Sequence, residues 1–112
     1  MLKKKYRLTK RKQFNYIYRR GRSQHGELLT LVFSYCKMKH IKVGFSASKK
    51  VGNSVKRHRA LRLMREAVKP LIDKMTPNHN YIFIAKEGMP GKTLAEIQKN
   101  VETVLRRAGL LN

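Results

Sequence analysis

The middle of the chain carries, from residue 48 to residue 66, the run SKKVGNSVKRHRALRLMRE. Its first part is typical of a polar turn, because Gly52 relaxes the backbone and Asn53 or Ser54 can cap a helix. From Val55 to about Lys69, apolar residues then recur at spacings of three and four, which is helical periodicity. The run therefore predicts a turn that leads into the longest helix of the chain.

This predicted helix has one apolar and one cationic face. The apolar positions are Ala60, Leu63, Met64, Ala67 and Leu71. The cationic positions on the opposite face are His58, Arg62, Arg65 and Lys69. Pro70 would clash with the carbonyl group four residues earlier, so we expect a kink there. One side of the helix thus suits packing, and the other side suits an anionic partner.

The basic residues of the run suit phosphate binding. Arginine presents a planar fork to phosphate, which fits a fixed RNA surface better than the lysine ammonium does. The arginines of this helix are Arg57, Arg59, Arg62 and Arg65. Lys49 and Lys50, with the free amides at the start of the helix, predict a second anion site.

Three other segments have strand character. Alternation of apolar and polar residues predicts strands from Leu28 to Cys36 and from Ile41 to Ala47. The short link between them predicts an antiparallel hairpin. In the first strand Thr30, Val32 and Ser34 fall on the face opposite the core. Residues 78–85 hold an unbroken apolar run, which is typical of a central strand covered on both faces.

Two further helices are predicted near the ends of the chain. Thr9 can cap a basic helix over residues 10–20, in which Phe14, Ile17 and Tyr18 share a face, and Gly21 ends it. Residues 93–107 form an amphipathic closing helix. Residues 1–8 are a basic lead that we expect to be mobile. The segments together predict one domain over residues 1–112.

The charge of the chain points to a polyanionic partner. Its 112 residues include 27 Lys or Arg and 6 Asp or Glu, a net charge of +21. Residues 1–65 hold 20 basic residues and one acidic residue, a net charge of +19. Nucleic acid is the commonest partner for such a surface; a solvated surface and an anionic membrane are the lesser alternatives. The chain has no apolar run of membrane-spanning length and only Cys36 for a disulfide, so we expect a cytoplasmic protein.

The sequence offers little for catalysis by the protein itself. The six acidic residues are scattered singly, and the four histidines lack the spacing of a metal site. No glycine-rich phosphate loop is present. We therefore expect no catalytic residue and no metal ligand in this chain.

The run from Ser48 to Glu66 resembles the signature of the bacterial ribonuclease P protein subunit family, in which SKK, a hydrophobic residue and GNAV precede an RNR core. Residues 10–21 resemble the opening helix of that family, and the strand that ends at Lys86 resembles its DYIIIAR-like segment. The resemblance covers about residues 5–107. His58 stands where the family has the Asn of RNR, and Leu61 stands at a position that is commonly Lys.

The resemblance implies a fold, an RNA partner and an accessory role. The implied fold is α+β, a single-domain α/β sandwich of ribosomal-protein-like type. In it, helices pack on a mixed, mainly four-stranded sheet with a left-handed crossover. The implied partners are a large catalytic RNA, which uses bound Mg²⁺ to remove the 5′ leader, and its substrate, precursor tRNA. Three alternatives are a ribosomal or other structural RNA-binding protein, a nucleoid DNA-binding protein, and a free nuclease, which lacks a carboxylate cluster here.

The resemblance also implies two sets of binding residues. Contacts to the catalytic RNA are expected from Lys49, Lys50, Asn53, Lys56, Arg57, His58, Arg59, Arg62 and Arg65. Contacts to the single-stranded leader, in a cleft between the first helix and the sheet, are expected from Phe14, Tyr18, Lys10, Arg11 and Val32. Periodicity alone leaves a core role open for Phe14 and Tyr18.

Overall fold

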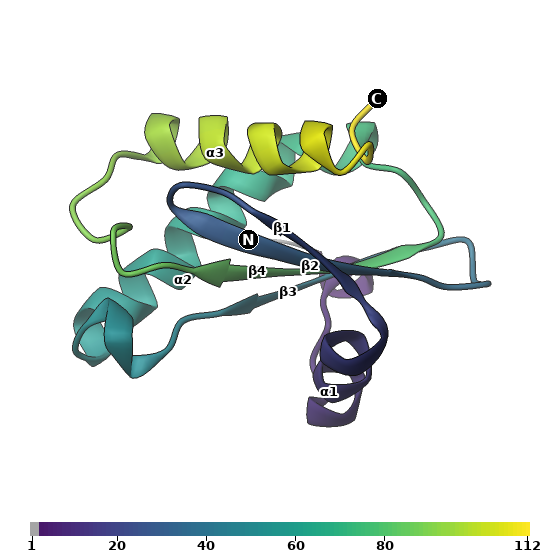
Figure 1. Cartoon of the computed structure of the whole chain (residues 1–112), viewed down its shortest axis with the longest axis horizontal. Coiled ribbons are helices and arrows are strands. Elements are labelled where there is room, and N and C mark those ends of the chain that lie inside the picture. The colour runs from purple at the N-terminus through teal and green to yellow at the C-terminus, as the bar shows by residue number, and fades with distance from the viewer. Residues whose placement is uncertain (1–2) are drawn as a thin grey trace.

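A computed structural model of the protein describes residues 3–112 (Figure 1). Its helices and strands follow one another as α1 (Arg11–Arg20), β1 (Arg22–His25), β2 (Leu29–Tyr35), β3 (Ile41–Ser46), α2 (Ser54–Val68), β4 (His79–Ala85) and α3 (Leu94–Arg107). Short 3-10 turns at Lys4–Tyr6, Lys49–Val51 and Lys69–Lys74 complete the order.

The strands form one four-stranded mixed sheet in the order β1-β2-β4-β3. β4 pairs antiparallel with β2 and parallel with β3. The predicted central strand is therefore confirmed, and Tyr81, Ile82 and Phe83 in it are fully buried. The predicted hairpin between residues 28–36 and 41–47 is wrong, because β4 inserts between β2 and β3 and takes the hydrogen bonds of both.

The two faces of the sheet carry different helices, as Figure 1 shows for α1 and α3. The larger core joins one face of the sheet to α2 and α3 through Leu29, Leu31, Val43, Phe83, Met64, Ala67, Ile97 and Val101. A smaller core joins the other face to α1 through Ile17, Val32 and Ile82. The predicted class, helices packed on a mixed four-stranded sheet, is confirmed.

The smaller core depends on a close approach between α1 and β3. Phe14 packs against this core, and a Cβ atom added to Gly44 would overlap its ring. Glycine at residue 44 therefore leaves the space on the sheet that the Phe14 ring fills. The ring of Phe14 therefore makes a structural contact, and because Phe14 is half-buried, part of its side chain stays accessible to a partner.

The basic lead, for which we expect mobility, contacts the sheet in the part that the structure describes. Leu8 is buried, and its backbone N–H donates to the Val43 carbonyl oxygen at 2.9 Å. Arg7 forms a bridge with Val43 on the outer edge of β3. These contacts anchor the lead because Leu8 supplies part of the smaller core. Residues 1 and 2 lie outside the described part of the chain.

Strand β1 is absent from the sequence-based predictions. Its residues, RSQH, are polar and mostly exposed, so they show neither alternation nor an apolar run. The strand exists because Gly21 lets the chain turn directly from α1 onto the edge of β2. A Cβ atom there would lie 2.5 Å from the Ile17 carbonyl oxygen and 2.7 Å from that of Phe33.

The helix ends agree in part with the predictions. α1 begins after Lys10, whose N–H donates to Gln13 Oε1 at 3.3 Å, so Thr9 is not its cap. α2 is capped by Asn53, whose Oδ1 accepts from the N–H of Lys56 at 3.0 Å. α2 ends at Val68, and Pro70 lies in the 3-10 turn that follows, so the helix ends near the residue where a kink was predicted.

Candidate nucleic-acid interface

The turn before α2 holds the SKK segment in a fixed shape. Ser48 Oγ accepts from the N–H of Lys50 at 3.3 Å, which caps the 3-10 turn Lys49–Val51. Gly52 has a φ of 143°, a backbone region that side chains disfavour. Val51 is buried and anchors the turn. Lys49 and Lys50 therefore project into solvent from a braced turn at the start of α2.

Most of the residues predicted to contact the catalytic RNA are exposed. The exposed members are Lys49, Lys50, Asn53, Lys56, His58, Arg59 and Arg62. Arg57 and Arg65 are half-buried. The structure thus places the predicted residues on one helix and the turn before it. They differ in solvent exposure, and the sequence pattern did not predict that difference.

The two half-buried arginines differ from the exposed ones. The Arg65 guanidinium lies 5.8 Å from the ring centroid of Phe45, a cation–π contact that fixes its direction. Arg57 has its Nε atom buried without a hydrogen-bond partner within residues 3–112. Both side chains are therefore partly withdrawn from solvent, and Arg59 and Arg62 are the fully exposed arginines of α2.

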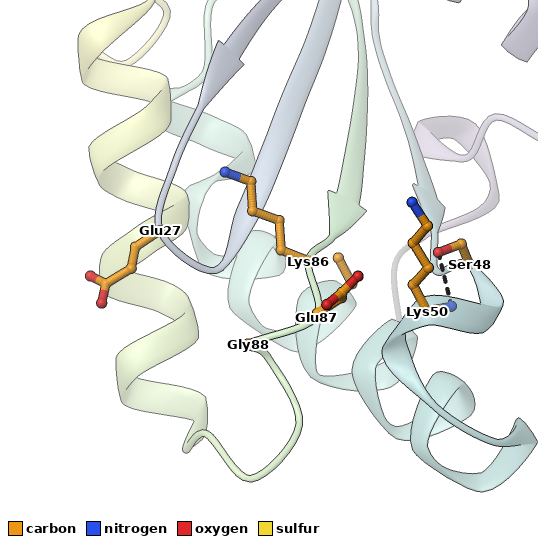
Figure 2. Close-up of a pocket in the computed structure, with 7 residues that line it drawn as sticks. Glu27, Ser48, Lys50, Lys86, Glu87 and Gly88 are labelled. Atoms are coloured by element: carbon orange, nitrogen blue, oxygen red, sulfur yellow. Dashed lines mark hydrogen bonds between the residues drawn. The ribbon is translucent and has the colours of Figure 1, made fainter.

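A hollow of about 430 Å³ lies beside this turn, at the ends of the parallel strands β3 and β4. Figure 2 shows Lys50 and Lys86 approaching it from different segments, with the Glu27 side chain directed away from them. Lys86 Nζ donates to the Gly26 carbonyl oxygen at 2.6 Å, which ties β4 to the β1–β2 turn. Lys50 Nζ makes no such hydrogen bond within residues 3–112, so Lys50 is the lysine of this hollow that is available to a ligand.

The residues predicted to contact the leader divide into two groups. Lys10 and Arg11 are exposed at the start of α1, and Tyr18 is 43% exposed. Phe14 is half-buried, with its ring 6.4 Å from that of Tyr18. Val32 is 6% exposed beneath α1, which covers most of its side chain, so its contact with the leader stays a prediction.

Two cationic residues near these surfaces were not predicted as site residues. Lys86 follows a buried strand, and its position after the apolar run of β4 was the available signal. Lys42 lies on β3 beside α1, where nothing in the sequence places that strand next to the helix. Strand pairing, which periodicity does not encode, brings Lys42 there.

The described residues offer no metal centre and no membrane segment. Within residues 3–112, no three His, Cys, Asp or Glu side chains form a group that could hold a metal ion. No helix in the same range is both long and apolar enough to cross a membrane.

Comparisons with known proteins identify relatives along nearly the whole chain. The ribonuclease P family model matches residues 2–109. The chain is 41% identical over 112 residues to the ribonuclease P protein component of Staphylococcus carnosus, covering 99% of this chain and 96% of that one. It is 36% identical over 107 residues to the component of an Exiguobacterium strain, covering 96% and 93%. The structure matches the Staphylococcus aureus RNase P protein with a TM-score of 0.86 at 31% identity, covering 96% and 98%.

Proposed function

Because the chain belongs to the ribonuclease P protein family, and is thus the protein subunit of that endoribonuclease, we propose a division of labour between its two sides. The α2 side binds the catalytic RNA, and the α1 side binds the 5′ leader of precursor tRNA. The observation that carries this proposal is the placement of α2 and α1 on opposite faces of one sheet. Two RNA strands can then contact the protein together, in the cytoplasm where we place the complex.

The α2 side supports binding of a folded RNA. Its exposed cations lie on a helix that is capped by Asn53 and braced against the larger core. Fixed guanidinium and ammonium groups neutralise phosphates and release counterions, which is the main source of affinity for RNA. His58, which replaces the Asn of the family motif, is exposed among these groups and offers an imidazole to the same surface.

The α1 side supports binding of a single strand. Tyr18 presents an exposed ring, and Lys10 and Arg11 present charges from the same helix. Aromatic rings stack on unpaired bases without strong sequence preference, and nearby cations neutralise the backbone. These features suit a leader whose sequence differs from one precursor to another.

The chain's own residues do not form a complete Mg²⁺ site, because the described part brings no three His, Cys, Asp or Glu side chains together. We propose that the RNA partner holds the Mg²⁺ and performs the hydrolysis of the phosphodiester. The protein then acts by binding and by charge, since its net charge of +21 offsets phosphate repulsion that cations otherwise screen.

Cleavage assays with separated components test this function. The protein alone should leave precursor tRNA intact, and the catalytic RNA alone should need a high Mg²⁺ concentration. The two together should cleave at the mature 5′ end at a lower Mg²⁺ concentration, because the protein supplies positive charge. Correct cleavage by the RNA-free protein would refute the accessory role.

Replacing Tyr18 by leucine should weaken binding of precursor tRNA and leave binding of mature tRNA unchanged. The exposed ring is lost while leucine keeps most of the apolar volume of the side chain, so folding should be little affected. One lost stacking contact corresponds to about 1–3 kcal/mol. The affinities of the assembled complex for the two tRNA forms are compared; equal losses for both would assign Tyr18 to a structural role.

A further inference from the structure

A second hollow, of about 350 Å³, lies on the same side of the sheet as α1. Its walls come from α1, from the segment between β2 and β3, and from β3 and β4. Tyr16 and Lys12 line it from the helix, and His40, Lys42 and Asn80 line it from the sheet side. Neither Phe14 nor Tyr18 belongs to its lining.

The hollow lies on the other flank of α1 from Tyr18. An α-helix turns by about 100° per residue, so Tyr16 and Tyr18 point about 200° apart around the axis. Ile17, between them in sequence, faces the sheet and is 1% exposed. The two tyrosines therefore stand on either side of the buried stripe of α1, and a ligand of one does not occupy the place of the other.

The walls of the hollow offer three kinds of contact. Tyr16 is 53% exposed, and the Arg20 guanidinium lies 5.8 Å from its ring centroid, which orients the ring. Leu8 and Ile17 supply apolar surface. Lys12 and Lys42 supply positive charge from opposite walls. An aromatic ring, apolar surface and paired cations are the set that binds a base together with its phosphates.

A polar chain on the sheet wall adds hydrogen-bonding groups. His40 Nε2 lies 3.2 Å from Asn80 Oδ1 and 3.4 Å from Cys36 Sγ. An Asn side chain whose oxygen is engaged in this way still carries an NH₂ group with two donors. The wall thus carries the donors and acceptors that a base edge requires.

The same polar chain does not form a nucleophilic catalytic site. Cys36 and Asn80 both approach the same nitrogen of His40, whereas a Cys-His-Asn relay needs one on each ring nitrogen. Burial also raises the pKa of the Cys36 thiol, which keeps it protonated. Binding is therefore the chemistry that remains for this hollow.

We propose that this hollow holds an unstacked nucleotide of the 5′ leader, farther from the cleavage site than the nucleotides that contact Tyr18. The proposal rests on the function proposed above for the α1 side. The leader is favoured over the catalytic RNA because α2, with its exposed cations, packs on the opposite face of the sheet. The basic residues 10–12 at the start of α1 provide a continuous path for a strand from one flank to the other.

A series of precursors with leaders of increasing length tests the proposal in the assembled complex. With the unchanged protein, affinity should rise in two steps, first as the leader reaches Tyr18 and again as it reaches the hollow. Tyr16→Ala should abolish the second step, a loss of at least about fivefold for long leaders, and spare the first. Tyr16→Phe keeps the ring and should retain both steps. Tyr35→Ala removes a tyrosine that is 69% exposed outside the hollow and should also retain both.

The two variants on α1 separate the two proposals. Loss of the first step with Tyr18→Leu and of the second with Tyr16→Ala supports both. If neither Tyr18→Leu nor Tyr16→Ala has a leader-dependent effect, the leader function of α1 fails. If only Tyr18→Leu has none, the leader contact proposed for Tyr18 fails and the hollow still stands as a leader site. If Tyr16→Ala keeps the second step, or weakens mature tRNA equally, the hollow is not a leader site. Circular dichroism of Tyr16→Ala checks folding. If that fold is disturbed, Tyr16→Leu removes the ring while keeping most of the apolar volume, and it should lose the second step in the same way.

Discussion

Replacing Arg59 and Arg62 together by alanine should weaken binding of the catalytic RNA and lower the slope of log affinity against log salt by about two. Both side chains are exposed on the outer side of α2. Each guanidinium that binds a phosphate displaces about one counterion from the RNA. A variant that lacks one guanidinium therefore displaces one counterion fewer, which lowers the slope by about one unit. Titrations of labelled catalytic RNA at several salt concentrations measure this slope directly.

The matched control uses exposed basic residues on the other long helix. Lys99 and Arg106 of α3 are exposed, so their double alanine variant removes the same charge from a different surface. It should change the salt slope much less than the α2 variant does. Equal slopes for the two variants would show that net charge, and not the α2 surface, sets the affinity. Arg57 is unsuitable for this test because it is half-buried and its Nε atom is shielded from solvent.

Gly44→Ala should destabilise the folded state strongly, although it replaces only one hydrogen atom by a methyl group. The new Cβ atom would overlap the Phe14 ring, whose helix is held over the sheet by Ile17. Overpacking of this kind costs about 1–3 kcal/mol of unfolding free energy. Urea denaturation followed by circular dichroism gives that free energy.

A double-mutant cycle with Phe14 checks the cause. Phe14→Leu removes the ring that the new methyl group meets, so the double variant should be more stable than the sum of the single effects predicts. Gly88→Ala is the control, since a Cβ atom at that residue has no neighbour within 4 Å. Strict additivity of Gly44→Ala and Phe14→Leu would mean that the methyl group clashes with something else.

The elements with strong periodicity were predictable, and their pairing was not. The apolar run of β4 indicated a central strand, and the spacing of apolar residues indicated α2 and α3. The hairpin prediction failed because proximity in sequence favours pairing of β2 with β3, whereas burial of β4 on both faces favours its insertion between them. β1 has no apolar pattern, and it exists through Gly21 and the edge of β2.

The sequence predicted which residues belong to the candidate site, but not which of their side chains are exposed to solvent. The helical spacing correctly placed the exposed Arg62 away from the apolar positions of α2. It did not show that the Arg65 guanidinium lies over Phe45, because that contact depends on where β3 passes. It also did not show that α1 covers most of Val32, since alternation within one strand says nothing about a helix arriving from the N-terminus.

The position of β4 also constrains how the chain can fold. β4 is the last strand in sequence, yet it lies between β2 and β3 and is the partner of both. A nascent chain that ends before residue 79 therefore has no strand through which β3 can join the sheet. Pairing across such sequence separations requires closure of long loops, which makes folding slow. The ribosome thus synthesises the cationic run at residues 48–66 well before the scaffold that orients it can assemble.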